Sequence, residues 1–309
     1  MSQPAPQQPS DEQHSRTRWI DPRLLMLVPG LVWGGNAIVA RAVAGEVPPI
    51  GLAFWRWTVA AMVVLPFAWP HLRRDVRVLA AHWPIVVLLA ACGISFFNAG
   101  LYLAAHTTTA LNIVMLQTAL PVLVVLASYL LFADTVTAAQ IAGIALSLAG
   151  ALTLITHGDI HVLTGLEFSI GDLWMLAACV VYALYTAMLR LRPPVHPLSF
   201  LVASFLVGAL LLLPFYLAES WGGHPMPLSW HGLLAVIYVS VFASAVGYFA
   251  FNGAVEALGA NTAGLSVYLV PVFGTILAIL LLGERPQIFH AVGIVLIAAG
   301  ILLAVRRRA

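Results

Sequence analysis

The sequence reads PVLVVLASYLLFAD at residues 121–134 and PVFGTILAILLLGE at residues 271–284. Each stretch is an apolar run that opens on Pro-Val and closes on an acidic residue, and the two lie 150 residues apart. At the same offset Gly143 matches Gly293. A series of matches at one offset predicts an internal duplication, and a duplication decides the architecture of a chain.

The composition around these stretches excludes a water-soluble fold. Hydrophobic types make up 61% of the 309 residues and charged types only 8%, whereas a soluble domain is roughly 25% charged. The mean hydropathy is +0.97. Too few polar residues remain to cover a soluble surface, so the surroundings must be lipid. A soluble enzyme, a nucleic-acid binder and a secreted disulfide scaffold are all excluded, and Cys92 and Cys179 read as small buried hydrophobes.

Ten apolar runs approach the roughly 20 residues that a ~30 Å hydrocarbon layer requires. They cover residues 24–43, 50–69, 83–104, 111–132, 138–156, 171–190, 198–218, 232–254, 262–282 and 288–305. The fold class is therefore predicted to be all-α, a polytopic membrane protein with ten transmembrane helices. Residues 1–21 are polar and rich in Pro and Gln, which predicts a disordered cytoplasmic arm.

The duplication divides these helices into two sets of five, residues 22–156 and 171–305. An external linker is expected at 157–170 and a cytoplasmic basic tail at 306–309. Because five is odd, the second set enters the membrane from the opposite side. Inverted repeats of this kind are typical of alternating-access transporters, which bind their substrate near the midplane.

The arginines fix the predicted orientation, since cytoplasmic loops are enriched in basic residues. All 14 basic residues are Arg. With both termini in the cytoplasm, only Arg41 and Arg285 fall outside and Arg56 falls within a span. The arginines on the cytoplasmic side are then Arg16, Arg18, Arg23, Arg73, Arg74, Arg77, Arg190, Arg192, Arg306, Arg307 and Arg308.

Several motifs recur in a fixed order along the chain. They are VWGGN at 32–36, FWR at 54–56, Pro121 with Asp134 thirteen positions on, and the second copy at 271–284. On these motifs the chain resembles the EamA-type transporters of the drug/metabolite transporter superfamily, over nearly all of its length beyond residue 21. One departure is Ala133-Asp134 where the second repeat has Gly283-Glu284, which keeps the acidic charge.

The resemblance implies an exporter of small metabolites, amino acids and aromatic amino acids among them. It implies a small-molecule substrate and no cofactor. The short loops and the lack of an added targeting segment favour the inner membrane of a bacterium. The oligomeric state, monomer or homodimer, stays open.

Polar side chains inside the spans form two helical stripes. Residues 83–104 carry Ser95, Asn98 and Tyr102, and residues 232–254 carry Ser244, Tyr248 and Asn252. Each set lies on one helix face. The repeat pairs Asn98 with Tyr248 and Tyr102 with Asn252. Because intramembrane polar groups are costly, they usually face the bundle interior or a wet cavity.

These stripes and the aromatic residues near them predict a central substrate cavity. The candidate substrate-binding residues are Trp33, Asn36, Arg56, Asn98, Tyr102, Tyr182, Tyr185, Tyr248, Asn252 and Tyr268. The alternative is that these groups bond helix to helix or lie at the membrane interface. For Arg56, one interpretation is a bidentate pair with a cargo carboxylate; the other is a structural role, snorkelling outward or bonding helix-end carbonyls.

Pro121 and Pro271 lie mid-span at equivalent positions. A proline kinks a helix, so each is predicted to be either a hinge or a static bend. The spans carry no Asp or Glu near their middle, which favours facilitated diffusion over tight proton coupling. The alternatives are a proton-coupled efflux pump and, in another class, a membrane-embedded enzyme or receptor. The chain contains no catalytic motif and no metal-ligand spacing.

Overall fold

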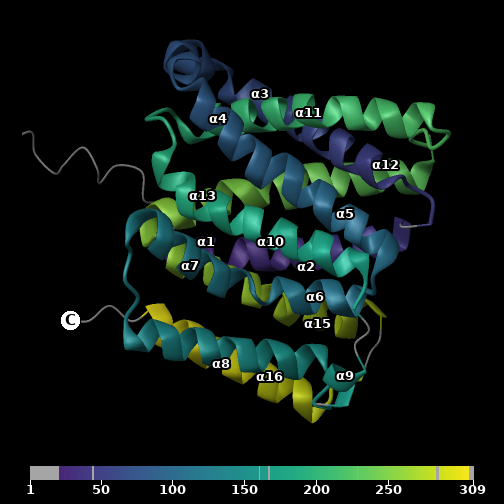
Figure 1. Cartoon of the computed structure of the whole chain (residues 1–309), viewed down its shortest axis with the longest axis vertical. Helices are drawn as coiled ribbons and strands as arrows, with labels where there is room; N and C mark the ends of the chain where they lie inside the picture. The colour runs from purple at the N-terminus through teal and green to yellow at the C-terminus, as the bar shows by residue number, and fades with distance from the viewer. Residues whose placement is uncertain are drawn as a thin grey trace, which may run out of the picture.

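A computed structural model of the chain describes residues 21–43, 45–159, 161–165, 168–227, 229–282 and 285–305. All regular structure in these residues is helical (Figure 1). Of the predicted arm 1–21, residues 1–20 lie outside the described residues, as does the predicted tail 306–309. The expectations for them therefore stay predictions.

The first repeat contains five spans. In chain order they are α1 (Pro22–Leu25) with α2 (Leu27–Val43); α3 (Pro49–Ala81); α4 (Trp83–Ala90), η2 (Ala91–Phe96) and α5 (Phe97–Thr107); α6 (Ala110–Gln117) with α7 (Leu120–Phe132); and α8 (Ala138–Ile155). A short α9 (His161–Thr164) lies between the repeats.

The second repeat contains the next five spans. They are α10 (Ile170–Met188) with η3 (Leu189–Leu191); α11 (Pro197–Trp221); α12 (Trp230–Tyr238), η4 (Val239–Val246) and α13 (Gly247–Leu258); α14 (Ala260–Ala263), η5 (Gly264–Tyr268) and α15 (Leu269–Leu282); and α16 (Ile288–Val305). Within the described residues, nine spans are at least 18 residues long and apolar enough to cross a membrane. The tenth is α2, with 17 residues. The predicted all-α polytopic fold is confirmed.

The packing follows the inverted repeat, because equivalent helices meet across the two halves. Helix α3 packs against its counterpart α11, and α8 packs against its counterpart α16. Helix α2 packs against spans 8 and 9 of the second repeat, while α10 packs against spans 3 and 4 of the first. The first helix of each repeat therefore sits among the helices of the other (Figure 1).

Two carboxylates cap helices across the repeats. Glu219, near the end of α11, accepts hydrogen bonds from the backbone N–H groups of Ile50 at 3.1 Å and Gly51 at 2.6 Å, which begin α3. At the opposite end, Asp75 of α3 accepts one from the N–H of His196, the residue before α11, at 3.0 Å. Each helix of this pair caps the other, since a carboxylate satisfies free N–H groups at a helix start.

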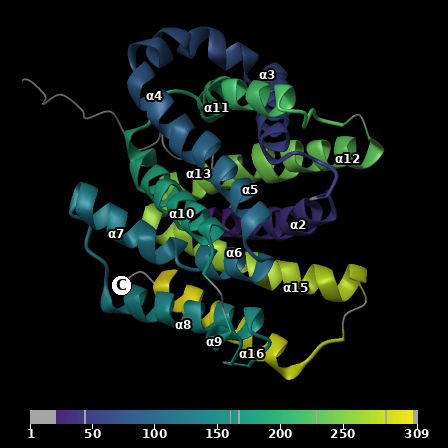
Figure 2. The ribbon, with the colours of Figure 1, turned by 45° about the vertical axis from the view of Figure 1, so that its right-hand side comes forward.

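Helices α8 and α16 form a glycine-lined pair at one edge of the bundle (Figure 2). A Cβ on Gly150 would lie 2.7 Å from the carbonyl oxygen of Gly293, and one on Gly143 would lie 2.5 Å from that of Gly300. The two backbones touch, as small residues permit in membranes. This glycine surface therefore joins the two repeats of one chain.

The same deviations from regular helix occur in both repeats. Spans 3 and 8 each contain a π segment, η2 and η4. Span 4 is interrupted between Gln117 and Leu120, and span 9 contains the 3₁₀ segment η5, which ends at Tyr268. Both irregularities therefore end just before Pro121 and Pro271. Such segments often mark functional sites.

Span 2 is longer than the predicted 50–69. Helix α3 runs to Ala81 and contains both Pro66 and Pro70. A proline costs one backbone hydrogen bond but does not have to end a helix, and the exposed Arg73, Arg74 and Arg77 keep the last turns solvated. We call the bundle end that carries these three residues with Arg190 and Arg192 the Arg-rich end.

Candidate substrate cavity

A cavity of about 280 Å³ lies between the two repeats. Its walls come from spans 1, 2, 3, 4, 6, 8 and 9. The lining residues are Trp33, Asn36, Val43, Val47, Pro49, Leu52, Arg56, Phe97, Asn98, Leu101, Tyr102, Ala105, His106, Ile113, Val114, Gln117, Leu120, Tyr182, Tyr248, Val267 and Val270. The walls are mainly aliphatic and aromatic, with a small number of polar groups, as in many small-molecule sites.

The cavity opens away from the Arg-rich end. Its lining includes Val43 at the end of α2, Pro49 at the start of α3, and Ala105 and His106 in the last turn of α5. Ala105 and His106 are exposed. These helix ends are all on the side of the bundle opposite the Arg-rich end, so this side forms the mouth.

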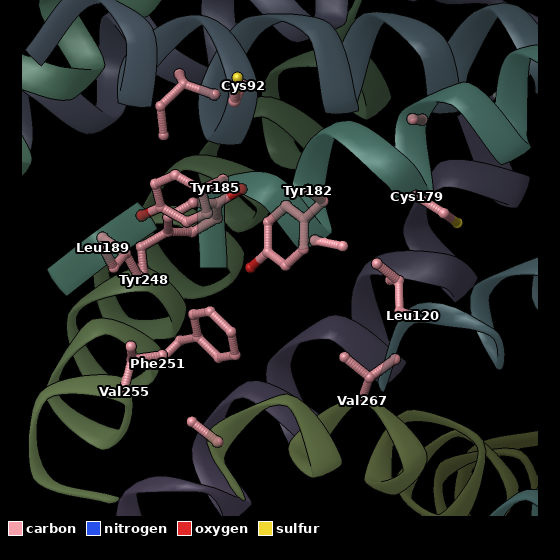
Figure 3. Packing of buried hydrophobic residues seen from close by; sticks show 14 of the residues in the cluster. Cys92, Leu120, Cys179, Tyr182, Tyr185, Leu189, Tyr248, Phe251, Val255 and Val267 are labelled. Atoms are coloured by element: carbon pink, nitrogen blue, oxygen red, sulfur yellow. The ribbon is translucent and has the colours of Figure 1, made fainter. Parts of the chain in front are cut away.

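Aromatic rings form the floor of the cavity. The ring of Trp33 lies 6.2 Å from that of Tyr182, 6.0 Å from that of Tyr248 and 5.5 Å from that of Phe251. Figure 3 shows Tyr182, Tyr248 and Phe251 gathered in the bundle interior. Edge-on and tilted contacts of this length are favourable between aromatic rings, so the floor is well packed.

Seven of the ten predicted site residues line the cavity: Trp33, Asn36, Arg56, Asn98, Tyr102, Tyr182 and Tyr248. The other three lie outside the lining. Tyr185 and Asn252 lie behind the floor, where the Tyr185 hydroxyl donates a hydrogen bond to Asn252 Oδ1 at 2.9 Å. Tyr268 is wholly buried in η5.

Some residues that line the cavity are not among the candidates predicted from the sequence. The candidates predicted from the sequence do not include His106, and Arg56 is their one residue in span 2. The signal was present in α5, because Asn98, Leu101, Tyr102, Ala105 and His106 lie on one helix face. Following that face to the helix end would have located the mouth.

Arg56 is held in the cavity wall by neutral groups. Its Nε donates a hydrogen bond to Ser244 Oγ at 2.6 Å, its Nη1 to Tyr102 Oη at 3.3 Å, and its Nη2 to the Ala243 carbonyl at 3.4 Å. The side chain is only 3% exposed. Ala243 and Ser244 belong to the π segment η4, so this segment supplies two of the three acceptors.

Below the floor, ion pairs join the helices at the Arg-rich end. Arg192 Nη2 lies 2.7 Å from Glu256 Oε1, and Arg190 Nη1 lies 3.0 Å from Asp134 Oδ2. The first pair joins span 6 to span 8, and the second joins span 6 to the loop after span 4. Together with the aromatic floor they close the cavity on this side.

The described residues contain no cluster of three or more His, Cys, Asp or Glu that could hold a metal ion.

Two side-chain hydrogen bonds join α2 to span 8. Trp33 Nε1 donates to the Ala243 carbonyl at 2.9 Å, and the Tyr238 hydroxyl donates to the Val32 carbonyl at 3.2 Å. Both bonds fix α2 against span 8, so Trp33 combines a structural bond with a place in the cavity wall.

The fold and the cavity are those of a polytopic membrane transporter. The family model of the EamA-like transporters matches the chain twice, at residues 23–156 and 169–306. The chain belongs to this family, within the drug/metabolite transporter superfamily, and the family consists of transporters rather than enzymes.

Relatives and a solved structure agree with this assignment. An uncharacterized transporter of Archaeoglobus fulgidus is 27% identical over 92% of this chain and 97% of its own. The probable terminal-alkyne amino-acid exporter of Streptantibioticus cattleyicolor is 29% identical over 83% of this chain and 84% of its own. A solved crystal structure with 22% identity shares the fold, with a TM-score of 0.75 over 92% of this chain and 96% of that one.

Proposed function

We propose that the chain is a uniporter that carries amino acids, aromatic ones among them, out of the cell across a bacterial inner membrane by alternating access. The observation that carries this proposal is the cavity between two inverted repeats, which is open at one end and closed at the other. Both termini and the Arg-rich end face the cytoplasm, following the positive-inside rule. The cavity then opens to the outside.

Pseudosymmetry supplies the second state. When inverted repeats exchange conformations, positions of the second repeat take over the roles of their equivalents in the first. Tyr102 lines the open cavity, while its equivalent Asn252 lies behind the floor. In the inward-open state Asn252, Tyr185 and Tyr268 line the pathway. Pro121 and Pro271, next to the irregular segments of spans 4 and 9, are the hinges.

Two observations support an amino-acid cargo. The wall combines aromatic and aliphatic surface with amide, hydroxyl and guanidinium groups, which suits a molecule with an apolar body and a polar end. The Streptantibioticus relative is named as a probable exporter of an amino acid. Facilitated diffusion follows from the described lining, which contains no Asp or Glu to relay protons.

A proton-coupled efflux pump is the second candidate, because histidine side chains serve as proton relays in some transporters and His106 lies at the mouth of the cavity. Uptake of labelled L-phenylalanine into proteoliposomes separates the two. Uniport predicts equilibration without uphill accumulation under an imposed pH gradient. Robust accumulation that His106→Asn abolishes would establish the pump instead.

The cavity residues are tested in the same assay. Trp33→Ala, Asn98→Ala and Tyr248→Ala are each expected to lower flux while folded yield is kept. Trp221→Ala is the matched control, since Trp221 is 82% exposed and lies at the end of α11. Near-normal flux in all three cavity variants would mean that these residues only pack.

A further inference from the structure

Arg56 carries a full positive charge into the interior of the bundle. It lies about two turns inside α3 and contributes to the cavity wall, and its side chain is 3% exposed. An ionised group within a membrane span is costly and is normally paired with an opposite charge. A carboxylate or another anion is therefore expected next to the Arg56 guanidinium.

The protein supplies no such partner in the part of the chain that the structure describes. None of the ion pairs found there includes Arg56, and no Asp or Glu is among the described residues of the cavity lining. The three acceptors around it are a serine hydroxyl, a tyrosine hydroxyl and a backbone carbonyl. The guanidinium is solvated by dipoles, but its charge is not neutralised.

The three hydrogen bonds leave N–H donors of the Arg56 guanidinium for an anion. A guanidinium has five N–H donors, and the three bonds above occupy Nε and one hydrogen on each terminal nitrogen. One N–H on Nη1 and one on Nη2 are left. Two N–H groups on neighbouring nitrogens match the two oxygens of a carboxylate, in the bidentate pair that arginine prefers.

The guanidinium is also fixed in place before any ligand arrives. Ser244 Oγ, which accepts from Nε, itself donates to the Val239 carbonyl at 2.8 Å within η4. The Arg56 guanidinium carbon lies 4.7 Å from the ring centroid of Trp57, a cation–π distance. A donor that is oriented in advance binds an anion at a lower entropic cost.

We propose that Arg56 is the anchor for a carboxylate of the cargo, so that the transported class is carboxylic acids with an apolar or aromatic body. The rest of the wall favours an organic anion over an inorganic one, because Phe97, Leu101 and Tyr182 offer it apolar surface. Ser244 is a positioning residue that orients the guanidinium. This inference rests on the proposed function, since it names what the cavity carries.

The test uses competition against uptake of labelled L-phenylalanine by wild-type proteoliposomes. The competitors are 3-phenylpropionate, which keeps the carboxylate, and 2-phenylethylamine and L-phenylalaninol, which lack it. Loss of a charge-assisted pair is expected to weaken competition about 10–100-fold. Equal competition by the compounds without a carboxylate would overturn the inference while leaving transport itself standing.

Variants then locate the effect. Arg56→Gln is expected to abolish the preference for carboxylates, and Arg56→Lys to keep part of it, because lysine is a point charge without the fork. Ser244→Ala is expected to raise the KM for L-phenylalanine more than it lowers the maximal rate, and this variant keeps the assignment testable if Arg56→Gln fails to fold. An unchanged preference in Arg56→Gln, or an unchanged KM in Ser244→Ala, counts against the anchor.

A binding measurement separates the two proposals. Stabilisation of the detergent-solubilised wild type against heat by 3-phenylpropionate, absent in Arg56→Gln, supports the anchor even if liposomes show no flux. That combination would contradict the transport proposal alone. No stabilisation by any of the carboxylates, together with no competition, would contradict the anchor.

Discussion

The Tyr185 hydroxyl donates a hydrogen bond to Asn252 Oδ1 at 2.9 Å, and this bond joins span 6 to span 8 just behind the aromatic floor of the cavity. Asn252 occupies the position that Tyr102 holds in the first repeat, and Tyr102 lines the cavity. One member of an equivalent pair is therefore in the cavity wall while the other is sealed. The proposed alternating access predicts this asymmetry for an outward-open state.

Removing this bond should make the cavity more accessible from the Arg-rich end, because the bond joins two spans behind the aromatic floor. Tyr185→Phe keeps the ring but loses a donor, and a neutral hydrogen bond is worth about 0.5–1.5 kcal/mol, or roughly 2–10-fold in a population. In a background with Cys92→Ala and Cys179→Ala, an Asn98→Cys thiol should react faster with a charged maleimide added from the Arg-rich side. Tyr129→Phe, at an exposed tyrosine, is the control. Labelling of Tyr185→Phe at the parental rate would show that the bond does not hold the seal.

The glycine contact between α8 and α16 should tolerate no added bulk. Gly150→Val places branched carbon against the Gly293 backbone, 2.7 Å from the first added atom, and overpacking costs about 1–3 kcal/mol or more. We expect a lower midpoint of thermal unfolding in detergent and a lower folded yield. Gly274→Ala in α15 is the matched control, because a Cβ there meets nothing within 4 Å. Equal stability of both variants would contradict the close contact.

The reciprocal caps should contribute to stability from both ends of the α3–α11 pair. Glu219→Ala leaves the N–H groups of Ile50 and Gly51 without their acceptor, and loss of a cap costs about 0.5–2 kcal/mol. Glu46→Ala is the control, because Glu46 is exposed and lies shortly before Ile50 in the sequence. A midpoint of unfolding in Glu219→Ala no lower than in Glu46→Ala would mean that solvent replaces the cap.

Acid should destabilise the start of α11. Burial lowers the pKa of His196 from its ordinary value of 6.5, and the neighbouring His71 lowers it further, against an opposing effect of Asp75. His196 Nδ1 accepts a hydrogen bond from the Leu198 N–H at 3.3 Å, which requires the neutral ring. As the pH falls through 6.5 the unfolded chain takes up the proton first, so the free energy of unfolding decreases.

His196→Asn removes this titration and keeps a side-chain acceptor at the cap. Thermal unfolding is measured at about pH 7.5 and at about pH 5.5. Between these two conditions the midpoint of unfolding is expected to fall less for His196→Asn than for the wild type. His224→Asn, at an exposed loop histidine, should follow the wild type. A wild-type slope in His196→Asn would place the acid sensitivity elsewhere.

The spans and the repeat could be predicted from the sequence because they depend on local composition. Apolar length marks each helix, and residues such as Pro121, Pro271, Gly143 and Gly293 mark equivalent positions. Helical periodicity was enough to place Asn98 and Tyr102 on one face, and the structure puts both in the cavity wall. The length of α3 could not be read, since a proline in a sequence does not say whether the helix continues.

The rest of the site depends on contacts between distant segments. The π segments η2 and η4 arise from hydrogen-bond register, which side-chain patterns do not encode, and η4 supplies two of the three acceptors that hold Arg56. Periodicity also cannot say which of two equivalent positions is open. Tyr102 and Asn252 occupy equivalent positions in the two repeats, and the conformation of the bundle decides that Tyr102 lines the cavity and Asn252 does not.

We expect the cargo to pass through the cavity between the two repeats. The direct measurement is L-phenylalanine flux in proteoliposomes that contain the Cys92→Ala, Cys179→Ala, Ala105→Cys variant, before and after a bulky methanethiosulfonate added at the mouth forms a mixed disulfide with the new thiol. Quantitative labelling should stop the flux, and reduction of the adduct should restore it. Full labelling with unchanged flux would contradict this expectation.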